Sequence, residues 1–165
     1  MNPKDMYQEL SQDQLFKDWQ KQNKNSYLSH FFVQMTAAMD ELSSWQVGFF
    51  DKDSQKITIF EQGNKGFIIQ PAADVFKKDE DVVEALSMKQ VKISLEEAKT
   101  KGKEELAQVF PNEQMGDGFL ILQVFNHQPV WNFTFITKTI KFANVKISAS
   151  SGKAVDTQTV DLVQK

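Results

Sequence analysis

Few side chains of this chain of 165 residues are suited to acid–base or metal chemistry. It has two histidines, His30 and His127, and no cysteine. Two histidines cannot build a multi-histidine metal site, and a Ser/His/Asp triad would need one of them. No Gly-x-Ser-x-Gly turn surrounds a serine, and without cysteine there is no thiol nucleophile, disulfide or Cys-ligated zinc. We therefore expect no catalytic residues and no enzyme.

The neighbours of each histidine predict a structural place for it. His30 lies inside the apolar run 27–35, which predicts a strand histidine on the polar face or bonded in the core. His127 lies beside Pro129 between two apolar runs, as a solvated turn residue would.

Two short motifs resemble ligand-binding loops but lack required residues. Asp51-Lys-Asp53 resembles the start of a calcium loop, but Lys56 occupies the sixth position, where glycine is required. Gly63-Asn-Lys-Gly66 lacks the Gly-Lys-Ser/Thr of a phosphate loop. We expect a hairpin turn and a loop at these places, and neither metal nor cofactor.

The aromatic residues leave two interpretations open. Trp131 and Phe133 alternate with polar residues, which is the period-2 pattern of a strand with one buried face. Trp45 leads a similar run. Such residues are either core anchors or the lining of a ligand groove, so Trp45, Trp131 and Phe133 are the candidate groove residues.

Composition limits the class of partner. Fourteen Phe and three Trp indicate a sheet-rich, aromatic core. The 19 basic and 22 acidic residues are mixed along the chain and give a net charge of −3, so we expect no nucleic-acid partner. No apolar run approaches the ~20 residues of a membrane span, so no membrane insertion is expected. The N-terminus lacks a signal-peptide pattern, which predicts a cytoplasmic protein, or an extracytoplasmic one if a leader has been removed.

In the first part of the chain the patterns predict a helix followed by strands. A helix is expected over 3–22, with a Ser11/Gln14 capping box and with Leu15, Phe16 and Trp19 on one face. Strands are expected over 27–35, 45–50 and 56–61, with a short strand 67–70 that stops at Pro71.

The second part repeats this order after a charged stretch, 72–92, in which a short helix is expected over 79–86. A Ser94/Glu97 capping box predicts a helix over 95–110 whose apolar face runs from Leu95 to Val109. After a loop at 111–118, strands are expected over 119–125, over 129–136 and from 145, with a turn at 150–153.

The two parts share a pattern that predicts an internal duplication. Trp45, Val47 and Phe49 correspond to Trp131, Phe133 and Phe135, and the pair Ile57/Ile59 corresponds to Val145/Ile147. We therefore expect an α+β fold of two helix-plus-three-strand units, each with its helix packed on an antiparallel sheet. The expected boundaries are 1–70, a connecting segment 71–92, and 93–165.

Residues 93–156 resemble a PepSY domain. The resemblance is carried by Ile93-Ser-Leu-Glu-Glu-Ala98, by the aromatic strand from Val130, and by 145–155, where Ser148 and Ser151 replace the family's Asp and Thr. It implies a cystatin-like unit, a helix laid across an antiparallel sheet, and a binding or regulatory role towards peptidases.

These observations predict a non-catalytic binding module for a protein or peptide, docked through an exposed sheet edge. The alternative is a small-molecule binder that uses the aromatic sheet face under the helix. An apolar pocket lined by Trp131 or Trp45 would favour the alternative, and a long unpaired edge without a pocket would favour the first. The oligomeric state stays open.

Overall fold

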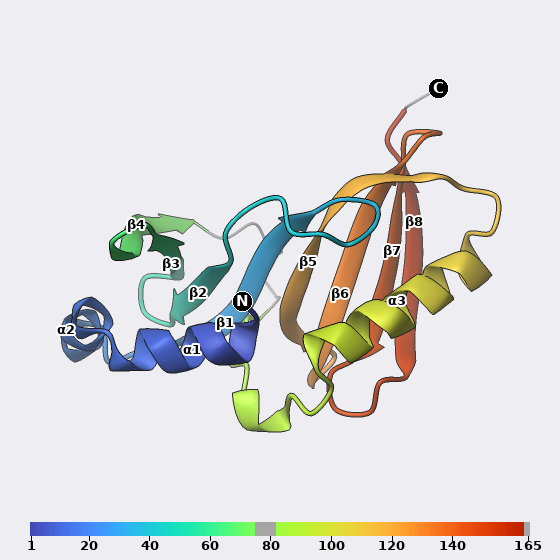
Figure 1. The fold of residues 1–165 in the computed structure, drawn as a ribbon. Coiled ribbons are helices and arrows are strands. Elements are labelled where there is room, and N and C mark those ends of the chain that lie inside the picture. The colour runs from blue at the N-terminus through green and yellow to red at the C-terminus, as the bar shows by residue number, and fades with distance from the viewer. Residues whose placement is uncertain (75–81, 164–165) are drawn as a thin grey trace.

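A computed structural model describes residues 1–74 and 82–163, and shows one antiparallel sheet with helices on one face (Figure 1). No helix in these two ranges is both long enough and apolar enough to cross a membrane. The helices are α1 (Pro3–Gln12), α2 (Gln14–Gln22) and α3 (Leu95–Val109), with a short 3₁₀ turn η1 (Met88–Gln90). The strands are β1 (Ser26–Met35), β2 (Gln46–Asp51), β3 (Lys56–Gly63), β4 (Gly66–Asp74), β5 (Met115–Phe125), β6 (Gln128–Thr137), β7 (Lys141–Ser148) and β8 (Ala154–Asp161).

The sheet consists of two four-stranded meanders that meet at its centre. Its eight strands have the order β4-β3-β2-β1-β5-β6-β7-β8, so β1 and β5 are neighbours and β4 and β8 are the edges. The central pairing places Phe31 opposite Leu122 and Val33 opposite Leu120, and all four side chains are buried. The α+β class and the antiparallel sheet are confirmed. Each meander has four strands where the proposed repeat unit has three, and the short strand expected over 67–70 is part of β4.

The aromatic ribbon expected around Trp131 is confirmed as the β6–β7 pair. Trp131 lies opposite Ile147 and Phe133 opposite Val145, and all four side chains are buried. Gly152 adopts a φ of 80° in the turn to β8, a conformation that side chains other than glycine rarely take. Period-2 alternation therefore predicted both the strand and its buried face.

The single helix expected over 3–22 is wrong, because the chain breaks at Asp13. This residue is extended, and its carboxylate accepts hydrogen bonds from the backbone N–H groups of Leu15 and Phe16 at 2.9 and 3.4 Å. It is therefore the N-cap of α2. Ser11 is no cap, since its hydroxyl donates to the Tyr7 carbonyl inside α1. The break also leaves Leu15 exposed, although it was expected on the buried face.

Several strand assignments need correction. β4 continues past Pro71 to Asp74, which is possible because an edge strand needs no outward N–H at every residue. β5 begins at Met115, inside the expected loop. In β3 it is Thr58 and Phe60 that are buried, whereas Ile57 and Ile59 lie on the opposite face, so the proposed match to Val145 and Ile147 has the wrong register.

The connecting segment also differs from the expected one. The helix expected over 79–86 lies partly outside the described residues, and 82–86 is not helical. Instead, the Leu86 N–H donates to the Leu28 carbonyl at 2.8 Å, which holds this segment against the start of β1.

Helix α3 is fixed to the sheet by its cap and by one close approach. The Ser94 hydroxyl accepts from the Glu97 N–H at 3.1 Å, as the capping-box pattern predicted. Gly102 faces β6, where an added Cβ would lie 2.9 Å from the Phe133 ring. Because Phe133 is fully buried, its ring cannot move aside. Val109, expected on this face, is exposed, since the helix ends there.

We predict that Gly102→Val lowers the free energy of unfolding by about 1–3 kcal/mol through overpacking against Phe133, measured by urea denaturation. Lys103→Val is the matched control, since it introduces the same side chain at an exposed helix position and should cost less than about 0.7 kcal/mol. Equal losses in the two variants would show that the close approach does not constrain the helix.

Candidate functional site

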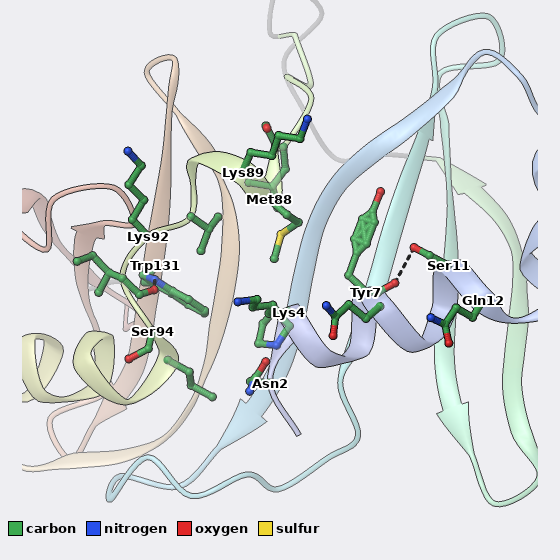
Figure 2. A pocket seen from close by; sticks show the side chains of 17 residues that line it. Asn2, Lys4, Tyr7, Ser11, Gln12, Met88, Lys89, Lys92, Ser94 and Trp131 are labelled. Atoms are coloured by element: carbon green, nitrogen blue, oxygen red, sulfur yellow. Dashed lines mark hydrogen bonds between the residues drawn. The ribbon is translucent and has the colours of Figure 1, made fainter.

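A groove of about 1230 Å³ lies between α1 and the segment 86–95 that leads into α3 (Figure 2). Its apolar lining comes mainly from that segment and from β6, whereas its polar lining comes from both α1 and the segment. The apolar lining residues are Pro3, Leu86, Met88, Val91, Ile93, Leu95 and Trp131.

The α1 wall is set by the capping and the amphipathic pattern of this helix. The Asn2 side chain accepts from the Asp5 N–H at 2.9 Å and starts the helix, and Met6 and Leu10 are fully buried against the sheet. The groove side of the helix carries Lys4 and Gln8, one turn apart. The helical period that buries Met6 and Leu10 therefore also places the polar residues Lys4 and Gln8 on the groove side of α1.

The opposite wall is anchored to the end of β7. The N–H groups of Lys92 and Ile93 both donate to the Ala149 carbonyl at 2.8 Å. The Trp131 indole N–H donates to the Ile93 carbonyl at 3.2 Å, and the Ser150 hydroxyl donates to the Gln90 carbonyl at 2.9 Å. These bonds give the segment, which before α3 contains only the short 3₁₀ turn η1, a defined position.

In the part of the chain that the structure describes, the charged side chains that line the groove are all lysines. They are Lys4, Lys89 and Lys92. Figure 2 shows Lys4 between α1 and Trp131, with Lys89 and Lys92 on the other wall. The chain as a whole carries a net charge of −3, so this cluster is a local exception. Such a site attracts anionic groups.

The structure does not bring the three candidate groove residues together. Trp131 borders the groove but is only 2% exposed, so it contributes an edge rather than a ring face. Trp45 borders a separate hollow of about 650 Å³ and donates its indole N–H to Glu41 at 2.9 Å. Phe133 lies under α3 at Gly102. All three pack in the core, as the first interpretation expected.

Sequence reasoning missed the residues that line the groove on α1 and on 86–95. One signal was present, because Lys4 and Gln8 recur at helical spacing opposite the apolar residues of 3–12. No comparable signal marks Lys89 and Lys92, since their segment has no period and is positioned by bonds to residues about 60 positions away.

His30 is a strand histidine, as expected. Its Nδ1 lies 2.7 Å from the Ser29 hydroxyl, and its ring lies so close to Gly48 that an added Cβ there would be 2.2 Å from Cε1. Burial lowers the pKa of His30 from 6.5 to about 4, so the ring is neutral at pH 7. No carboxylate bonds to its ring in the described residues, so Ser29 and His30 form no triad there.

His127 lies in the β5–β6 turn, as predicted. It has a φ of 67°, and its side chain is 90% exposed and contacts Glu84. Within residues 1–74 and 82–163, no group of three or more His, Asp or Glu side chains could hold a metal ion.

A scan against protein-family models and searches of curated proteins and of solved structures found no match to this chain. The resemblance of 93–156 to PepSY domains therefore stays a prediction.

The lowered pKa of His30 predicts a pH-dependent stability. The unfolded chain binds a proton near pH 6.5, whereas the folded chain binds it only near pH 4, so the free energy of unfolding falls as the pH drops from 6.5 towards 4. We expect a slope of up to about 1.4 kcal/mol per pH unit between pH 6 and 5 in urea denaturation.

His30→Gln should remove this slope, and His127→Gln, which changes the only other histidine, should retain it. The window lies above the titration of the carboxylates, so acid-sensitive groups such as Glu113, whose pKa is lowered chiefly by its bond to Thr139, contribute little there. A slope that persists in His30→Gln would contradict the assignment.

Proposed function

We propose that this chain is a non-catalytic binding module that holds an acidic, partly apolar peptide segment of another protein in the groove between α1 and 86–95. The observation that carries the proposal is the lining, which combines three lysines with apolar side chains and, among residues 1–74 and 82–163, contains no carboxylate. Apolar contacts supply binding energy, and the lysines select for acidic side chains and speed the encounter.

The size of the groove favours a peptide over a small molecule. Its volume of about 1230 Å³ exceeds the range of roughly 300–1,000 Å³ that is typical of small-molecule pockets. Trp131 borders the groove, and an apolar pocket at this residue would favour a small-molecule ligand. The lining, however, mixes polar and apolar side chains, and Trp131 is almost wholly buried. The aromatic sheet face under α3 offers little room, because Phe133 packs against Gly102.

We further propose that the two meanders, each with its own helices, are tandem cystatin-like units of PepSY type. Two contacts support this arrangement. Phe16 of α2 packs on Phe49 and Phe60 of its own meander, with ring centroids 5.0 and 5.2 Å apart, and α3 packs on β7 and β8 of the other. The PepSY resemblance would make the peptide partner a peptidase or a segment that regulates one.

We predict that a labelled peptide of about ten residues, alternating Glu with Leu and Phe, binds the protein in a fluorescence-anisotropy titration, and that added salt weakens the binding. Lys89→Glu/Lys92→Glu should raise Kd by about tenfold or more, since it places two negative charges in the groove.

The matched control is Lys101→Glu/Lys103→Glu, which changes the net charge equally on exposed positions of α3 outside the groove. It should leave Kd within about twofold. Two further peptides separate charge from apolar contact, one with Lys in place of Glu and one with Ser in place of Leu and Phe, and both should bind weakly. Equal binding of the acidic and basic peptides, or equal losses in the two double variants, would refute the groove as the site.

A further inference from the structure

Within the part of the chain that the structure describes, strand β8 presents unpaired backbone groups along one edge of the sheet. The Leu162 N–H donates to the Ile140 carbonyl at 3.0 Å, and the same register places Val160 opposite Phe142 and Gln158 opposite Asn144. In an antiparallel pair, alternate residues direct their N–H and C=O groups to the partner strand. The backbone groups of Thr157, Thr159 and Asp161 therefore point outward, away from β7.

The two edges of the sheet differ in how they are protected. β4 carries Pro71, which has no N–H, and its pairing with β3 has a register shift. β8 contains neither proline nor lysine, and its pairing with β7 has a register shift only at the start of β8, between Lys146 and Ile147 of β7, and is regular from Asp156 to Asp161. Edge strands of monomeric proteins usually carry such devices, so β8 is open to another strand. Its exposed apolar residue, Val160, is 52% exposed.

Charge does not oppose pairing at this edge. The Asp156 carboxylate lies 3.0 Å from the ammonium of Lys146, which is buried and also donates to the Asn144 side chain at 2.6 Å. Asp156 is thus neutralised within the chain. The other acidic residue of β8 is Asp161, at its far end.

We propose that β8 pairs antiparallel with β8 of a second copy, about a two-fold axis that passes between the two Thr159 residues. This register places Thr159 opposite Thr159 and Thr157 opposite Asp161, so the outward-facing groups form bonded pairs and no like charges meet. Threonine pairs are favourable cross-strand neighbours, and a Thr hydroxyl can donate to an Asp carboxylate opposite it. An isologous contact of this kind closes after two copies and leaves no new edge at the join. The pairing does not depend on the groove or its ligand.

Sedimentation-velocity ultracentrifugation of the full chain, from about 1 to 300 µM, tests this pairing. The protein is expected to shift from monomer to dimer across this range, which is the range of affinity of small interfaces. Thr159→Lys and Thr159→Glu should each be monomeric throughout, because each places two like charges opposite one another. An equimolar mixture of the two should dimerise again, because the opposed charges then attract.

Thr159 is exposed and its N–H points away from β7, so both variants should keep the thermal melting temperature of the original chain, which circular dichroism checks. Ala72→Lys on the other edge, β4, is the matched control and should dimerise like the original chain. A chain that stays monomeric at 300 µM overturns the proposal. A dimer that persists in both Thr159 variants also overturns it, because the contact then lies elsewhere. A protein that stays monomeric and pairs only with extended peptides of other sequence overturns it as well.

Discussion

The pairing of β1 with β5 is the contact on which the rest of this structure depends. Each meander alone has a central strand with an unpaired edge, and Phe31, Val33, Leu120 and Leu122 would lose cover on that side. Joining β1 to β5 satisfies both backbone edges and buries these side chains in one continuous core. β1 and β5 are the first strands of their meanders, so the later strands of each meander lie progressively farther from the centre.

This pairing also creates the groove. Because both meanders turn the same face towards their helices, α1 and α3 lie on one side of the sheet (Figure 1). The segment 86–95, hydrogen-bonded to Ala149 and Ser150, lies beside α1, and the groove remains between the two. The resulting groove has an apolar floor because the core reaches it at Trp131. Its lysines come from two elements that are far apart in the sequence.

Local sequence patterns predicted β6 and the start of α3, although β6 is buried on both faces, including Asn132 and Thr134. The alternation at 131–135 and the Ser94 cap were sufficient for β6 and for the start of α3. The break at Asp13 was missed because a single carboxylate bonding two N–H groups outweighs helical propensity across 3–22. The buried face of β3 was predicted wrongly because isoleucine is usually a core residue. In this strand the buried residues are Phe60 and Thr58.

The groove could not be predicted, because it depends on the β1–β5 contact and on hydrogen bonds between residues 90–93 and 149–150, which no local pattern encodes. Trp45, Trp131 and Phe133 are candidate groove residues because of their aromatic side chains, but all three side chains are buried in the core. The lysines that distinguish the site look like ordinary surface residues in the sequence.

The most direct test of the account is amide and indole NMR of the ¹⁵N-labelled protein during titration with the Glu/Leu/Phe peptide. The account predicts that chemical-shift changes concentrate in residues 3–12 and 86–95, and include the indole N–H of Trp131, which borders the groove and bonds to Ile93. Changes that concentrate instead along β8, or around Trp45 and its separate hollow, would contradict the claim that the groove between α1 and 86–95 is the binding site.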